Sequence, residues 1–111
     1  MTPPRSFQDN LNTLPTVDAI AAIELLDSNG QRVCRLENQP GTAGSVRVYH
    51  ALLQRHGAIN PAAAQEGLAL YAEHTADARQ FPGKHPNIDR LLAIAEQQAA
   101  TLQGSIIARQ D

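Results

Sequence analysis

Residues 19–37 read Ala19-Ile-Ala-Ala-Ile-Glu-Leu-Leu-Asp-Ser-Asn-Gly-Gln-Arg-Val-Cys-Arg-Leu-Glu37, with a largely apolar segment on each side of a polar turn. Asn29-Gly30 tolerates the positive φ angles of a tight turn, and the side chain of Asp27 can bond nearby backbone groups. The stretch therefore predicts a β-hairpin. Arg32 falls on the same face as Cys34, so the alternation of apolar and polar residues is imperfect near the turn.

A hairpin of two strands is only marginally stable in water, so this one needs cover. Helices, a further strand or another molecule could supply it. One other short segment rich in β-branched residues lies near the C-terminus, Gly104-Ser-Ile-Ile-Ala-Arg109. It either adds a third strand over 105–109 or continues the preceding helix.

Apolar spacing and capping signals predict about four helices around the hairpin. They lie at about 6–13, from a cap at Thr42 or Ser45 to 56, from Asn60-Pro61 to about 80, and from 88 to about 102. Gly57 is the residue expected just past a helix end. The expected fold class is α+β, with the hairpin packed against these helices.

Size and composition indicate one domain over residues 1–111, with loose ends at 1–5 and 110–111. The formal net charge is −2, and the nine Lys and Arg residues are dispersed along the chain with only four aromatic residues. This pattern argues against nucleic-acid and membrane-surface binding. No secretory signal or membrane-spanning run is seen, and the single cysteine, Cys34, suits a reducing compartment. We therefore expect a cytoplasmic protein.

The loop Gly41-Thr-Ala-Gly-Ser45 follows a predicted strand and opens a predicted helix, a setting in which backbone N–H groups can hold an anion. Arg47, in the first turn, could add a charged donor. Neither of the common glycine-rich nucleotide motifs is present, and a turn followed by a helix cap explains the same residues. Gly41, Thr42, Gly44, Ser45 and Arg47 are the candidate anion-binding residues.

A second candidate region lies between Tyr71 and His85, where the clustered Glu73, His74 and Asp77 could meet His85 around a polar ligand or a metal. Two histidines at metal-ligand spacing on one helix are absent, so we assign no metal and no cofactor. A solvated helix end explains the same residues. Ser45 and Cys34 lack the surroundings of a catalytic nucleophile, so we assign no catalytic residue.

Three segments resemble a family of short bacterial proteins of unknown function. They are Arg47-Val-Tyr-His-Ala-Leu-Leu-Gln-Arg-His-Gly57, Gly67-Leu-Ala-Leu-Tyr-Ala-Glu-His-Thr-Ala-Asp77 and Pro82-Gly-Lys-His-Pro-Asn-Ile-Asp-Arg-Leu-Leu92. The resemblance implies a bacterial single domain in the cytoplasm. It implies no activity, cofactor or catalytic residue.

Two functions remain open from the sequence. The first is a protein-interaction or structural module that pairs with a protein partner or with a second copy, because the hairpin has unsatisfied edges and only 18% of the residues are charged. The second is a binding protein or enzyme for a small molecule or anion, using the Gly41–Arg47 loop or the Tyr71–His85 region. We expect the first.

Overall fold

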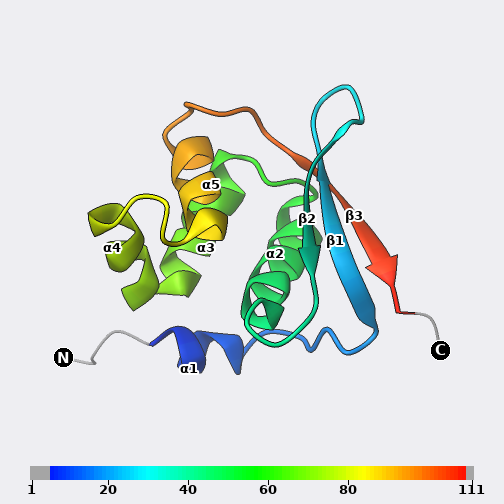
Figure 1. The fold of residues 1–111 in the computed structure, drawn as a ribbon, viewed down its shortest axis with the longest axis horizontal. Coiled ribbons are helices and arrows are strands. Elements are labelled where there is room, and N and C mark those ends of the chain that lie inside the picture. Colours follow the sequence, from blue (N-terminus) through cyan, green and yellow to red (C-terminus); the bar gives the residue numbers. More distant parts are fainter. Residues whose placement is uncertain (1–5, 110–111) are drawn as a thin grey trace.

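The computed structural model describes residues 6–109. Three strands, β1 (Ile20–Leu26), β2 (Arg32–Glu37) and β3 (Gln103–Ala108), form an antiparallel sheet in the order β2-β1-β3 (Figure 1). The predicted hairpin is confirmed as β1 and β2. The C-terminal segment is a strand that begins before the expected residue 105, and it places β1 in the middle of the sheet.

The irregularity that the sequence showed near Arg32 is a break in the strand register. Leu25 pairs with Cys34, whereas Leu26 pairs with Arg32, so Val33 has no partner across the strands. An extra residue on one strand bends it and disturbs the alternation of faces. Val33 is accordingly 55% exposed.

Five helices complete the fold: α1 (Phe7–Leu11), α2 (Ala43–His56), α3 (Pro61–Tyr71), α4 (Glu73–Gln80) and α5 (Pro86–Ala95). Ser6 and Asp9 form a capping box at the start of α1. The α+β fold class is therefore confirmed. The predicted ends 1–5 and 110–111 lie outside the described residues.

The prediction of one helix from 61 to about 80 is wrong, because the chain breaks at Ala72, which has a φ of 53°. Side chains occupy two carbonyl groups at the end of α3. Nδ2 of Asn10 donates to the Leu70 carbonyl at 2.9 Å, and Oγ1 of Thr75 donates to the Leu68 carbonyl at 2.6 Å. These contacts take the place of backbone hydrogen bonds that a continuous helix would make.

The prediction that the last helix reaches about residue 102 is also wrong, since α5 ends at Ala95. Leu102 instead pairs with Ile59, with backbone N–H···O distances of 2.8 and 3.1 Å. Both side chains are buried. Residues 96–101 therefore leave the helix to bring Leu102 to this bridge and the following residues into β3.

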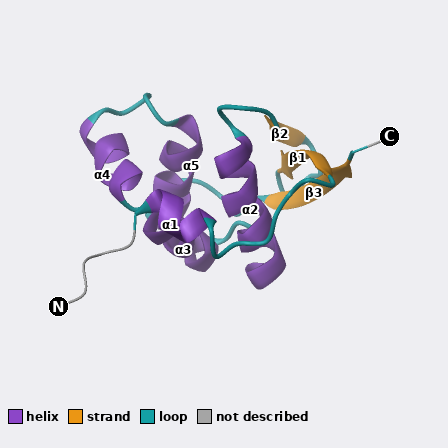
Figure 2. Cartoon of the chain, turned by 90° about the horizontal axis from the view of Figure 1, so that it is seen from below, coloured by secondary structure: helices purple, strands orange, loops and turns teal. Residues whose placement is uncertain are grey.

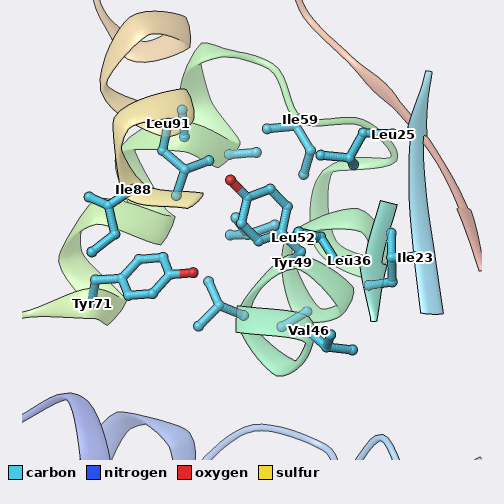
Figure 3. Packing of buried hydrophobic residues seen from close by; sticks show 14 of the residues in the cluster. Ile23, Leu25, Leu36, Val46, Tyr49, Leu52, Ile59, Tyr71, Ile88 and Leu91 are labelled. Atoms are coloured by element: carbon cyan, nitrogen blue, oxygen red, sulfur yellow. The ribbon is translucent and has the colours of Figure 1, made fainter. Parts of the chain in front are cut away.

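The helix α2 lies between the sheet and the other helices (Figures 1 and 2). Its buried Tyr49 and Leu52 belong to one hydrophobic cluster with Ile23 and Leu25 of the sheet and Leu91 of α5 (Figure 3). A single core thus joins the sheet to the helical layer. Among the described residues, no helix is both long and apolar enough to cross a membrane.

Candidate functional site

A pocket of about 500 Å³ lies where α1, α2, α3 and α4 and the start of α5 meet. Binding sites for small molecules commonly have volumes of about 300–1,000 Å³. None of the lining residues is acidic, and they combine an apolar part with a part rich in hydrogen-bond donors. The lining residues are Phe7, Leu11, Gly41, Thr42, Ala43, Gly44, Ser45, Tyr71, His74, Lys84, His85, Pro86, Asn87 and Ile88.

The helix α2 begins at this pocket. The hydroxyl of its N-cap residue, Thr42, does not cap the helix and donates instead to the Glu37 carbonyl at 2.6 Å. The Gln39 carbonyl accepts from the N–H groups of Thr42 and Ala43. Within residues 6–109, no acceptor is bonded to the N–H groups of Gly44 and Ser45. The first turn therefore offers donors to a ligand.

The helix α5 begins at the same pocket. Its N-cap residue, His85, makes no side-chain cap, and Pro86 stands in the first turn. The partial positive charge at a helix N-terminus is about half an elementary charge. In α5 this charge is partly offset by Asp89 in its first turn. The start of α2 has no acidic residue in its first turn, so it is the helix start that most favours an anionic group in the pocket.

Asp77 of α4 holds the two basic residues that line the pocket from the loop before α5. Its Oδ2 atom lies 2.6 Å from Nε2 of His85 and 3.0 Å from Nζ of Lys84. These two hydrogen bonds, first that of His85 and then that of Lys84, hold the pKa of the Asp77 carboxyl below its usual range. Asp77 itself does not line the pocket, so it positions the side chains of His85 and Lys84 from outside the lining.

Two aromatic residues close the pocket on the side of α1 and α3. The ring of Phe7 stacks on Tyr71 with centroids 5.2 Å apart, and the edge of His74 meets Phe7 at 5.0 Å. Burial raises the pKa of Tyr71, whose hydroxyl donates to Oγ of Ser45 at 2.7 Å. Because Oγ of Ser45 accepts this bond, its own hydrogen can be donated to a bound acceptor.

Glu73 stands outside the pocket lining and fixes α1 instead. Its Oε1 atom accepts a hydrogen bond from the N–H of Phe7 at 2.7 Å. This bond keeps the pKa of the Glu73 carboxyl below its usual value. Glu73 thus secures the start of α1 and, with it, the apolar wall that Phe7 contributes.

The two regions that the sequence indicated separately meet at this one pocket. Gly41, Thr42, Gly44 and Ser45 line it from one side, and His74 and His85 line it from the other, with ring centroids 5.9 Å apart. Arg47 does not line it, because its guanidinium donates to the carbonyl groups of Leu14 and Pro15 at 3.0 and 3.3 Å.

Lys84 and Asn87 are the polar residues of the pocket lining that the sequence interpretation passed over. A signal for the start of α5 was present, because Pro86 occupies a position that proline favours in the first turn of a helix. The convergence of α2 with α5 had no local signal, since it depends on packing. Within residues 6–109, no three His, Cys, Asp or Glu side chains gather as metal ligands.

Cys34 is half-buried in β2, and its Sγ atom accepts a hydrogen bond from Arg90 of α5 at 3.1 Å. It takes no part in the pocket. The hydroxyl of Ser45 also lines the pocket, and its hydrogen-bond partner there is Tyr71 and not a histidine. The arrangement can hold a small ligand by hydrogen bonds and apolar contact.

Comparison with known proteins identifies the family to which the chain belongs. Residues 7–104 match the model of a family described as an uncharacterized protein conserved in bacteria (DUF2322). No curated protein and no solved structure matched the chain. The family match spans most of the chain and includes all the segments that carried the resemblance. The chain therefore belongs to this family of uncharacterised bacterial proteins.

Proposed function

We propose that this protein binds a small organic anion in the pocket between the starts of α2 and α5. The observation that carries the proposal is the convergence of two helix N-termini, Lys84 and two histidines on one pocket, whose lining within residues 6–109 includes no acidic residue. A negative group would accept hydrogen bonds from the first turn of α2 and from Lys84. The pocket volume leaves room for more than the anionic group itself.

A ligand of this kind should stabilise the folded protein. Thermal unfolding of the full chain with acetate, benzoate, phosphate and phenyl phosphate measures this directly. We expect at least one of these anions to raise the Tm, because a ligand that binds only the native state adds its binding energy to stability. Each kcal/mol gained corresponds to a rise of about 4–8 °C for a domain of this size.

Lys84→Ala should weaken the affinity for the anion at least about tenfold and so reduce the rise in Tm. The change removes a donor and leaves the Asp77 carboxylate beside the pocket without the ammonium group that pairs with it. Arg79→Ala is the matched control, since Arg79 is an exposed cation of α4 that does not line this pocket. An equal loss in both variants, or no Tm response to any of the anions, would contradict the proposal.

A second candidate function is self-association through the edge of β3. The exposed edge strand β2 carries Arg32, Arg35 and Glu37, and charged residues protect an edge from pairing. The six residues of β3 include no charge, and Ile106 is 42% exposed. Two copies could pair through β3 into one continuous sheet. The hairpin itself gives less support to association than the sequence suggested, because β3 and α2 cover it within the chain.

The mass of the protein in solution tests this second candidate. Sedimentation equilibrium at high concentration should give twice the mass of the chain, and Ile106→Lys should return it to the mass of one chain. Val33→Lys places the same charge on the opposite edge, where it should leave the dimer intact. A single-chain mass for the unmodified protein at every concentration would remove this candidate.

A further inference from the structure

The charges around the pocket bear on which anion it takes. Lys84, the one lysine of the chain, lies 3.0 Å from Asp77, so the negative charge of Asp77 offsets its positive charge. What remains to attract an anion is the partial positive charge at the starts of α2 and α5. The start of α2 carries about half a charge, and the charge at the start of α5 is reduced by Asp89 in its first turn, so the total is no more than about one charge.

The rest of the pocket is suited to an apolar group. Phe7 and Leu11 of α1 and Ile88 of α5 line it, together with Pro86. Ile88 is only 2% exposed and Leu11 only 8%, so these side chains form a firm wall at the edge of the core. An inorganic ion would fill only part of such a space and would leave this wall in contact with water.

From these two observations we infer that the ligand is a monocarboxylate with a compact apolar or aromatic body, and that Asp77 sets this preference over phosphate esters by offsetting Lys84. This inference rests on the proposed function and names its ligand class. A carboxylate carries one negative charge, which is the smallest charge that an anion can bring to these helix starts. A phosphate monoester carries close to two at neutral pH, so more of its charge would be left without a counterpart.

Gly44 limits where the body of the ligand can lie. A Cβ atom at this position would come within 3.2 Å of the ζ carbon of Phe7 and 3.4 Å of a δ carbon of Leu11. The first turn of α2 thus lies close against the apolar wall. A carboxylate at the N–H groups of Gly44 and Ser45 would therefore have its apolar body beside Phe7 without crossing a polar region.

Isothermal titration of the full chain with benzoate, phenyl phosphate, acetate and benzamide tests the inference. We expect benzoate to bind about tenfold more tightly than phenyl phosphate, which shares its ring. Acetate, which lacks the ring, and benzamide, which lacks the charge, should both bind more weakly than benzoate. Tighter binding of phenyl phosphate, or equal binding of acetate, would overturn the inference while leaving the proposed anion site intact.

The substitution Asp77→Asn isolates the role of the charge. It keeps the size of the side chain and removes the negative charge that offsets Lys84. The ratio of the benzoate affinity to the phenyl phosphate affinity should therefore fall by about tenfold. Asp18→Asn changes the net charge of the protein equally at an exposed position outside the pocket lining and should leave the preference unchanged. An unchanged preference in Asp77→Asn would overturn the inference. If neither benzoate nor phenyl phosphate binds better than benzamide, the proposed function fails with it.

Discussion

Replacing Leu91 with alanine should lower the free energy of unfolding by about 2–5 kcal/mol, the range measured for large-to-small changes in well-packed cores. Leu91 is fully buried in α5 and packs in the cluster that joins the helices to the sheet (Figure 3). Small domains are stable by only about 5–15 kcal/mol, so this one change removes a large share of the total. Urea unfolding followed by circular dichroism measures the loss.

The helix α3 lies close against α5 at Gly67, so a second substitution there can test the packing around Leu91. A Cβ atom at Gly67 would lie 2.7 Å from a δ carbon of Leu91 and 2.9 Å from one of Leu52. Gly67→Ala alone should therefore destabilise the protein by overpacking, although alanine favours a helix by about 1 kcal/mol over glycine. In the Leu91→Ala background the closest of these contacts is gone and Leu52 has room to shift, so the same methyl group should destabilise the protein much less.

The size of the Gly67→Ala effect thus depends on the residue at position 91. Leu92→Ala is the matched control, because Leu92 lies on the same helix and is only half-buried. It should cost less than Leu91→Ala, and Gly67→Ala should remain destabilising in its presence. Strictly additive effects of Gly67→Ala and Leu91→Ala would show that the two helices do not pack as closely as described.

The elements that the sequence predicted well are those with local signals. Asn29-Gly30 between two apolar segments is sufficient for a hairpin, and Asn60-Pro61 is sufficient for a helix start, where Oδ1 of Asn60 caps the N–H of Ala63 at 2.8 Å. The third strand stayed open because its pairing with β1 joins residues far apart in the sequence. Its residues read equally well as a frayed helix until β1 lies beside them.

The wrong helix boundaries have the same origin. Nothing near Ala72 marks a break, because the break depends on Asn10, which reaches the end of α3 from a distant part of the chain. The early end of α5 depends on Ile59, which pairs with Leu102. Each boundary is set by a partner that only the tertiary structure brings close.

The candidate site was predicted in two halves but not as a whole. The glycines at 41 and 44 indicated a helix start open to an anion, and His74 and His85 indicated a polar cluster. That these halves line one pocket follows from the packing of α2 against α3 and α5. The role of Arg47 could not be judged from its place in the first turn, because the two carbonyl groups that bind it lie 32 and 33 residues earlier in the chain.

Raising the pH above about 10 should destabilise the protein through its buried tyrosines. Tyr49 is fully buried, and its hydroxyl donates to the Asn87 carbonyl at 2.5 Å and accepts from Nη1 of Arg90 at 3.1 Å. Burial, only partly opposed by Arg90, raises the pKa of Tyr49 to about 12. In the unfolded chain the same group ionises near pH 10.

The sign of the effect follows from proton binding. Between about pH 10 and pH 12, the unfolded chain has lost the Tyr49 proton while the folded protein still holds it, so the folded state binds more protons. Stability is therefore fully present below pH 10 and falls as the pH rises toward 12, by roughly 3 kcal/mol for a gap of about two pKa units. Burial also raises the pKa of Tyr71, which acts in the same direction.

Tyr49→Phe separates this effect from the titration of other groups. At neutral pH the variant should be about 1–3 kcal/mol less stable than the original protein, because the Asn87 carbonyl loses its donor. Above pH 10, however, its stability should fall less steeply, so the two stability curves converge. Urea unfolding at a series of pH values measures both curves.

The chain has two tyrosines and no tryptophan, so tyrosinate absorbance follows these two groups directly. Parallel curves would mean that the pKa of Tyr49 is the same in the folded and unfolded states. That result would contradict the prediction that burial raises its pKa.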